Sequence, residues 1–188
     1  MAEPAPRKAT YEDLYSIPEN MTGEIIDGEL HVTPRPSRSH AHSATSLGGE
    51  LVPLYQFGRG GPGGWIILVE PEIMFGDDLL VPDLAGWKRE RFPVEEPHNW
   101  ISVSPDWVCE LLSPGTMRKD RVHKMRIYAR HRVPHLWLVD PTAKSLEVFQ
   151  LDDSGRWIVL GVYFEDDKVR AEPFSRLEFD LSNLWLQP

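Results

Sequence analysis

The chain has 188 residues, of which 41% are hydrophobic, and its net charge is -9 at pH 7. This length supports one domain with a sizeable core and is short for two, so we expect a single domain over residues 1–188. The sequence holds no apolar run of about eighteen residues, and its start, MAEPAPRKAT, lacks the apolar stretch of a secretory signal. It therefore predicts a soluble, cytoplasmic protein that does not contact membranes.

The negative net charge limits how the protein can bind nucleic acid. Tight non-specific binding to duplex DNA relies on Lys and Arg side chains that neutralise phosphates, and the net charge argues against it. Contact would need a local basic patch, and residues 117–132 carry seven Lys and Arg side chains. The same density is typical of a solvated helix face, so both interpretations stay open.

The single cysteine, Cys109, excludes an internal disulfide and a multi-cysteine zinc site. It lies in the apolar run WVCELL, where a free thiol usually behaves as a small buried hydrophobe. The alternative is a nucleophile served by His135 and Asp140, but no local signature supports it. We interpret Cys109 as a buried strand residue.

The N-terminal half predicts a short helix, a hairpin and a bent helix. Thr10 and Asp13 have the spacing of a capping box at the start of TYEDLYSI. Asp27-Gly28, between two apolar-rich runs, predicts a hairpin with a type I′ turn. Residues 39–57 have apolar positions at helical spacing, but Pro53 and two glycines predict an interruption. GRGGPGG then reads as a flexible loop without the spacing of a phosphate cradle.

The second half predicts a mixed sheet built around a strand-helix-strand unit. WIILVEP, EIMF and LLVPDLAGW are strand candidates, and residues 88–106 form a long loop. We expect 79–83, 107–112 and 135–140 to be strands of one sheet, with helix 117–131 packed on it through Val122, Met125 and Ala129. SLEVFQL and RWIVLGVYF form a C-terminal antiparallel hairpin, and a helical turn near DLSNLW places Trp185 in the core.

Two carboxylates in apolar surroundings indicate a site of chemistry. Asp83 ends the run LLVPD, and Glu110 lies inside WVCELL. Burying an unpaired carboxylate costs several kcal/mol, so such a group must be neutralised, paired or bound to a metal. Two carboxylates on neighbouring strands also repel unless a cation lies between them. Mg²⁺, which binds one or two carboxylates together with waters and phosphate oxygens, fits this pattern.

A structural interpretation of the same residues is open. Glu110 could pair with an arginine of the 118–132 helix while Asp83 caps a turn. Asp120 and Lys124, four residues apart, could form a surface ion pair of little energetic value. Turned toward the sheet, however, Lys124 could stabilise the charge that develops on a phosphate during attack by water.

His40 and His42 also suggest a metal pair. At positions i and i+2 of a helix they face apart, so we expect them to contact solvent or substrate instead.

The strings GEIIDGEL, LLVPDLAGW and WVCELLSPGTMRKDRVHKMRIYARHRVPHLWLVDP resemble the Uma-type "putative restriction endonuclease" family of bacteria, also known as a domain-of-unknown-function family. The resemblance covers about residues 10–185. That family is placed in the PD-(D/E)XK nuclease superfamily. The resemblance implies an α/β, restriction-endonuclease-like fold with a central mixed β-sheet flanked by helices.

The resemblance also implies roles for particular residues. Pro82-Asp83 matches the PD element and Glu110 the second acidic position, with the carbonyl of Leu111 as a further metal ligand. The superfamily lysine would fall at Leu112, so the resemblance implies that it has moved to Lys124, with Lys119 as a substitute. Glu24 matches the N-terminal acidic residue that often completes such sites.

The function implied is hydrolysis of phosphodiester bonds in nucleic acid, expected to be DNA, with Mg²⁺ or alternatively Mn²⁺ as the cofactor. The superfamily also contains members without catalytic activity, so fold membership alone does not establish activity. A catalytically inactive interaction module, forming a homodimer through exposed Trp-rich surface, is the alternative from another class. A nuclease acting on RNA or on special DNA structures is a second alternative.

Overall fold

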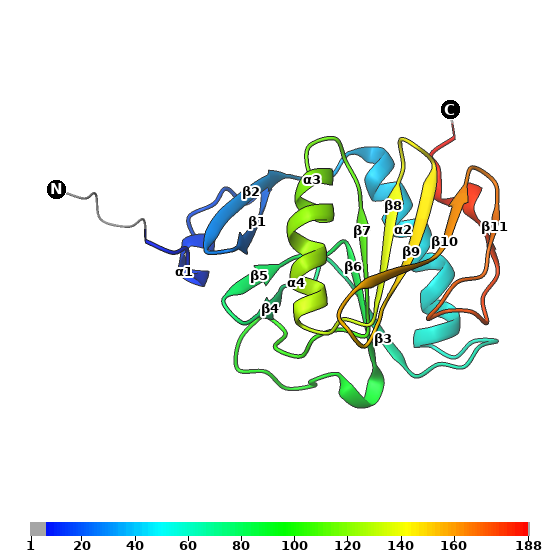
Figure 1. The fold of residues 1–188 in the computed structure, drawn as a ribbon, viewed down its shortest axis with the longest axis horizontal. Coiled ribbons are helices and arrows are strands. Elements are labelled where there is room, and N and C mark those ends of the chain that lie inside the picture. The colour runs from blue at the N-terminus through cyan, green and yellow to red at the C-terminus, as the bar shows by residue number, and fades with distance from the viewer. Residues whose placement is uncertain (1–6, 188) are drawn as a thin grey trace.

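Apolar runs with strand periodicity form a six-stranded mixed sheet at the centre of the protein. The computed structural model describes residues 7–187, and its large sheet has the strand order β10-β9-β8-β7-β6-β3 (Figure 1). These strands are β3 (Trp65–Val69), β6 (Leu84–Lys88), β7 (Trp107–Leu111), β8 (His135–Asp140), β9 (Ser145–Leu151) and β10 (Trp157–Phe164). Only β7 and β8 pair in parallel, which confirms the predicted strand-helix-strand unit and the mixed sheet.

Helices cover both faces of this sheet. Alternate residues of a strand point to opposite faces, and β7 accordingly contributes Cys109 to one core and Val108 to the other. On the Cys109 side the sheet packs against Leu47 of helix α2 (Arg38–Leu51). On the Val108 side it packs against Ile127 of helix α4 (Met125–Arg130), which lies in front of the sheet in Figure 1.

A smaller four-stranded sheet, with order β2-β1-β5-β4, lies at one end of the molecule (Figure 1). It comprises β1 (Met21–Ile26), β2 (Glu29–Pro34), β4 (Ile73–Phe75) and β5 (Asp78–Leu80). Asp27 and Gly28 have φ values of 53° and 85°, as a type I′ turn requires, so the predicted hairpin is confirmed. The short helix α1 (Tyr11–Leu14) precedes it, and Asp13 accepts a hydrogen bond from the Thr10 N–H at 2.8 Å.

The prediction of one strand over 79–83 in the same sheet as 107–112 was wrong. β5 ends at Leu80 in the small sheet, and β6 begins at Leu84 in the large one. Pro82 lacks the N–H that a sheet ladder uses. The chain therefore leaves one sheet and enters the other between these strands, and Asp83 lies directly at this crossing.

Both predicted long helices contain π-helical segments. α2 continues as a π-helix over Val52–Gln56, at Pro53, which lacks the backbone N–H for a regular helical bond and so confirms the predicted interruption. The segment predicted as helix 117–131 consists of α3 (Met117–Lys119), a π-helix (Asp120–Lys124) and α4. π-helical turns inside α-helices occur frequently at functional sites.

The predicted inner face of this second helix was wrong in part. Val122 is 45% exposed, whereas Asp120 and Lys124 are each 3% exposed and Tyr128 is fully buried. Positions 120, 124 and 128 follow one another at steps of four and form one stripe. The helix therefore turns a polar stripe toward the sheet, which the rule that apolar residues face inward does not anticipate.

The C-terminal part agrees with the prediction. β9 and β10 form an antiparallel hairpin, with a bulge between Val159 and Gly161. The strand pair β11 (Lys168–Val169) and β12 (Phe179–Asp180) leads to a 3-10 turn over Leu181–Leu184, after which Trp185 is 4% exposed in the core. Within residues 7–187, no helix is long and apolar enough to cross a membrane.

Candidate active site

The crossing between the two sheets places Asp83 beside the end of β7. Leu84, the next residue, is opposite Cys109 in the antiparallel pair of β6 and β7. The Asp83 Oδ2 atom accepts a hydrogen bond from the Leu111 N–H at 2.7 Å. Asp83 is thus held next to the segment that carries Glu110, as the sequence predicted.

Glu110 is buried and bound by two groups of the helix in front of the sheet. The Lys124 Nζ atom lies 3.0 Å from its Oε1 and 2.9 Å from its Oε2. The Tyr128 hydroxyl donates a further hydrogen bond to Oε1. Burial raises the pKa of Glu110 well above its usual value, although the Lys124 ammonium opposes the shift. Its charge partner is therefore a lysine, not the arginine considered from the sequence.

Lys124 lies between two carboxylates from different sheets. Its Nζ atom is 2.8 Å from Glu24 Oε1 in β1, in addition to its contacts with Glu110, and 3.7 Å from Asp120 Oδ1. Burial alone lowers the pKa of a lysine, but the neighbouring carboxylates outweigh it and raise the pKa of Lys124 well above its usual value. Lys124 is therefore charged, and it faces the sheet instead of forming a surface ion pair.

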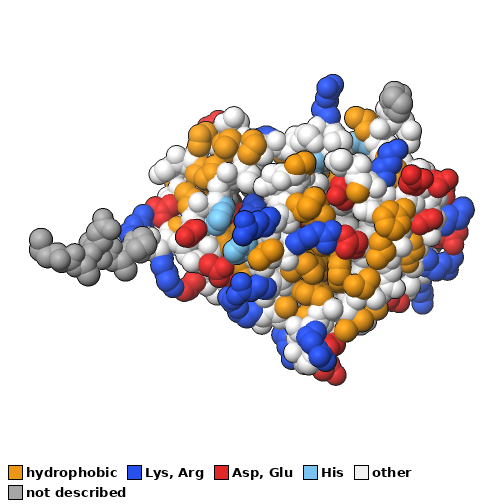
Figure 2. Space-filling model, turned by 45° about the horizontal axis from the view of Figure 1, so that its top comes forward, with side chains coloured by type: hydrophobic (Ala, Val, Ile, Leu, Met, Phe, Trp, Pro, Cys, Tyr) orange, Lys and Arg blue, Asp and Glu red, His pale blue; other side chains and the backbone are white. Residues whose placement is uncertain are grey.

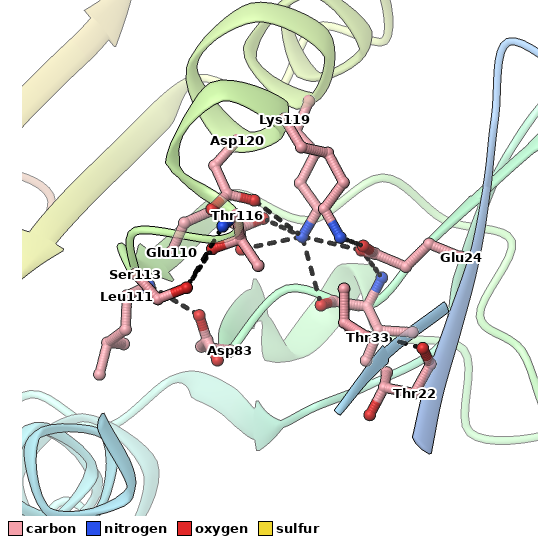
Figure 3. Close-up of polar contacts among 12 residues, drawn as sticks. Thr22, Glu24, Thr33, Asp83, Glu110, Leu111, Ser113, Thr116, Lys119 and Asp120 are labelled. Atoms are coloured by element: carbon pink, nitrogen blue, oxygen red, sulfur yellow. Dashed lines mark hydrogen bonds and ion pairs between the residues drawn. The ribbon is translucent and has the colours of Figure 1, made fainter. Parts of the chain in front are cut away.

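Glu24 has its own set of partners. Lys119 donates to its Oε2 at 2.5 Å, and the Val81 N–H donates to Oε1 at 2.9 Å (Figure 3). Burial raises the pKa of Glu24, but Lys124 and Lys119 outweigh burial, so the net shift is downward. Glu24 in β1 is thus joined to the helix after β7 by ionic contacts and to the crossing between β5 and β6 by a hydrogen bond.

His40 contacts Asp83, a partner that the expected contact with solvent or substrate did not include. Its Nε2 atom lies 2.5 Å from Asp83 Oδ1. It stands about one turn before Ser43 and two turns before Leu47, on the buried face of α2. That spacing is the sequence signal that could have found it. His42 lies apart from Asp83, with its Nε2 atom 3.5 Å from Ser46 Oγ.

These residues line one cavity of about 530 Å³. Its floor carries four carboxylates, from Glu24, Asp83, Glu110 and Asp120, against the ammonium groups of Lys119 and Lys124. Four carboxyl groups thus face two ammonium groups, and burial raises the pKa of Glu110 and of Asp120. Figure 3 shows the carboxylates converging from the two sheets and the helix. A cation bound in this cavity would reduce the repulsion among these carboxyl groups.

The candidate metal ligands named from the sequence offer only oxygen atoms. In the part of the chain that the structure describes, no group of three or more His, Cys, Asp or Glu side chains is arranged to hold a metal. The carboxylates of Asp83 and Glu110 together with the backbone carbonyl of Leu111 would supply oxygen ligands only. Oxygen ligands are those that Mg²⁺ and Mn²⁺ prefer.

The residues predicted from the sequence therefore meet in space. Asp83, Glu110, Leu111, Lys124 and Glu24 all line the cavity. Tyr128 and Asp120 were not recognised as partners of the site, although both stand four residues from Lys124, on the same helical stripe. Cys109 is fully buried and burial raises its pKa well above the usual value, so the thiol contributes to packing.

The mixed sheet flanked by helices is the fold of a nuclease-like α/β protein. A crystal structure of a "putative nuclease belonging to DUF820" from Anabaena variabilis matches it with a TM-score of 0.76 at 23% sequence identity. The match covers 94% of this chain and 97% of that chain. Among curated proteins, none matches.

The family is shown by a second comparison. The Uma2 family model, described as "Putative restriction endonuclease", matches residues 9–183. The chain belongs to this family, and the resemblance found in the sequence is confirmed.

Proposed function

We propose that this protein is a metal-dependent nuclease that hydrolyses phosphodiester bonds of nucleic acid, with DNA as the expected substrate. The observation that carries the proposal is the buried Lys124 ammonium, which lies 2.8 to 2.9 Å from the carboxylates of Glu24 and Glu110, in a cavity that Asp83 also lines. The cavity combines candidate metal ligands with a positioned cation. Membership of the nuclease-like family supports the same conclusion.

Each residue has a distinct role in this proposal. Asp83, Glu110 and the carbonyl of Leu111 would hold Mg²⁺ or Mn²⁺, which when bound lowers the pKa of a water molecule and polarises the phosphate. Lys124 stabilises the charge that develops on the phosphate oxygens. Glu24, which contacts both Lys124 and Lys119, orients these ammonium groups toward the cavity.

The test uses purified protein with single-stranded and double-stranded DNA and RNA, in the presence of Mg²⁺, Mn²⁺ or chelator. Cleavage is expected only with metal, and Asp83→Ala and Glu110→Ala are expected to abolish it. Lys124→Ala should bind the metal in calorimetry yet cleave about 10²–10³-fold more slowly, the usual cost of removing one charge-stabilising donor. Glu178→Ala, in an exposed ion pair with Arg170, is the matched control and should cleave normally.

Two outcomes would change the proposal. Full activity of Lys124→Ala would move the stabilising role to Lys119. No cleavage of any substrate by the wild-type protein, with metal binding retained, would contradict the nuclease proposal.

The interaction module is the second candidate, and one observation favours it. β10 is an edge strand of the large sheet, and its side chains Val159, Val162 and Phe164 are 55%, 46% and 54% exposed. Figure 2 shows hydrophobic side chains gathered over the region of the surface where α4 and β10 lie. The exposed Trp-rich surface expected from the sequence is absent from residues 7–187, because five of the seven Trp side chains are buried. A homodimer joined at the β10 edge instead is compatible with either candidate function.

A further inference from the structure

A second, smaller hollow adjoins the cavity of the candidate active site. It has a volume of about 270 Å³ and lies between α1, the start of β1 and the segment that precedes β4. Four residues line both spaces: Thr22, Arg35, Glu70 and Val81. The two spaces therefore adjoin along a shared wall formed by these residues.

Tyr15 gives this hollow an open aromatic surface. Its side chain lines the hollow and is 76% exposed. Tyr11 contacts it edge to face, with ring centroids 5.6 Å apart, and Tyr11 is itself packed on Trp100 at 4.4 Å. The Tyr11 hydroxyl also donates to Glu72 Oε2 at 2.6 Å. A fixed neighbour thus supports Tyr15 on one side and leaves much of the ring open to a ligand.

The other lining residues suit a nucleobase attached to a phosphate. Leu14, Ile17 and Met21 add apolar surface beside the tyrosine rings. Glu70, on the shared wall, can accept hydrogen bonds from the exocyclic amino groups of bases. Arg35, also on this wall, can neutralise a phosphate of the backbone. The volume lies just below the ~300–1,000 Å³ of small-molecule sites, which suits one base and not a longer segment.

The depth of the larger cavity argues against a continuous duplex as the ligand. Glu24 and Glu110 are each 2% exposed and Lys124 is 3% exposed. A scissile phosphate must enter the cavity to approach them. Duplex DNA is stiff, with a persistence length of about 150 base pairs, and bending it sharply is costly. A single strand bends freely and leaves its bases free to stack on aromatic side chains.

We propose that the substrate is single-stranded nucleic acid, with its scissile phosphate in the larger cavity and an adjacent unpaired base stacked on Tyr15 in the smaller hollow. This inference rests on the proposed nuclease function and specifies its substrate class. Tyr15 is a binding residue in this arrangement, and the chemistry remains with the residues of the larger cavity.

The test measures binding separately from cleavage. Fluorescence anisotropy with labelled twelve-nucleotide DNA, single-stranded or as the matching duplex, is recorded in chelator so that no metal-dependent cleavage occurs. The single strand should bind more tightly than the duplex. Tyr15→Ala should weaken binding of the single strand about 5- to 150-fold, the effect expected for losing one stacked base, whereas Tyr15→Phe should retain it.

Phe57→Ala is the matched control, because Phe57 is also an exposed aromatic, at 56%, and lines neither space. It should bind like the wild type. In cleavage assays with Mg²⁺, Tyr15→Ala should raise KM and leave kcat nearly unchanged, which a general loss of structure would not produce. Circular dichroism melting of each variant checks that the fold is kept.

The outcomes separate this inference from the proposed function. Equal binding and cleavage of duplex and single strand, or unchanged binding by Tyr15→Ala, would overturn the inference while the nuclease stands. Binding of single strands that depends on Tyr15, without cleavage under any metal condition, would overturn the nuclease and support the hollow as a binding site.

Discussion

At the residue scale, Lys124 determines the electrostatics of the cavity. Among residues 7–187 it is the one group that contacts Glu24, Glu110 and Asp120 together, and all four side chains are buried. Removing one member of a buried ionic group leaves the others without compensation, which costs more than the intact group contributes. Lys124 and its carboxylate partners therefore differ in how much their removal should cost in stability, because one ammonium group serves three carboxylates.

This asymmetry gives a stability prediction. Lys124→Met leaves its three carboxylate partners facing one another and should lower the free energy of unfolding by about 3–5 kcal/mol. Glu110→Gln removes a carboxyl group whose pKa burial already raises, while Lys124 keeps Glu24 and Asp120, so this variant should lower the free energy of unfolding much less. Urea unfolding without metal measures both variants.

Glu178→Gln provides the control, since exposed pairs contribute only about 0–1 kcal/mol. A larger loss in Glu110→Gln than in Lys124→Met would show that Glu110 is chiefly a structural partner of the helix.

At the scale of elements, the sequence predicted what local rules govern. The Asp27-Gly28 turn, the strand-helix-strand unit and the C-terminal hairpin each follow from short patterns, and all three are confirmed. The need of Glu110 for a partner was also predictable, because a carboxylate in an apolar strand requires one, and the structure supplies Lys124 and Tyr128.

Other features depend on contacts between distant segments. The separation of β5 and β6 into two sheets follows from pairing with β1 and β7, which residues 79–83 do not specify. The polar inner stripe of the helix at 120, 124 and 128 arises because β1 and β7 present carboxylates to it. His40 faces Asp83 across 43 residues of sequence. The periodicity of one element can show which face a side chain lies on, but it does not show which distant residue that side chain contacts.

Two glycines in these elements should respond to alanine in opposite ways. Gly49 lies in α2 with nothing within 4 Å of an added Cβ atom, so Gly49→Ala should raise the free energy of unfolding by about 0.5–1 kcal/mol. Gly28 has φ of +85°, and an added Cβ would lie 3.1 Å from Lys8 Cγ. Gly28→Ala should therefore lower the free energy of unfolding by about 1–2 kcal/mol.

Thermal and urea unfolding of the two variants, side by side, check this prediction. A destabilised Gly49→Ala would mean that the junction of α2 with its π-helical end requires the flexibility of glycine. An unaffected Gly28→Ala would contradict the type I′ geometry of the turn.

At the scale of the whole molecule, the two edges of the large sheet differ. β3 forms one edge with five residues, and β10 forms the other with eight residues, none of them charged. Edge strands of monomeric proteins are usually protected by charges, prolines or bulges. β10 has a bulge at Val159–Gly161 but no charge, so its outer hydrogen-bonding groups and apolar side chains favour pairing with another strand.

We therefore predict a homodimer in which two β10 strands pair antiparallel about a two-fold axis, the symmetry that most homodimers adopt. Light scattering after size exclusion should give twice the chain mass at micromolar concentration. Val162→Lys and Phe164→Lys place charges on the outer strand and should yield monomers. Val69→Lys is the matched control, since Val69 is an exposed apolar residue, at 61%, on the opposite edge strand β3. The Val69→Lys variant should stay dimeric.

A wild-type monomer at tens of micromolar, or dimers that persist in both β10 variants, would contradict this interface. Cleavage retained by the monomeric variants would show that each chain carries a complete active site, whereas its loss would tie the chemistry to assembly.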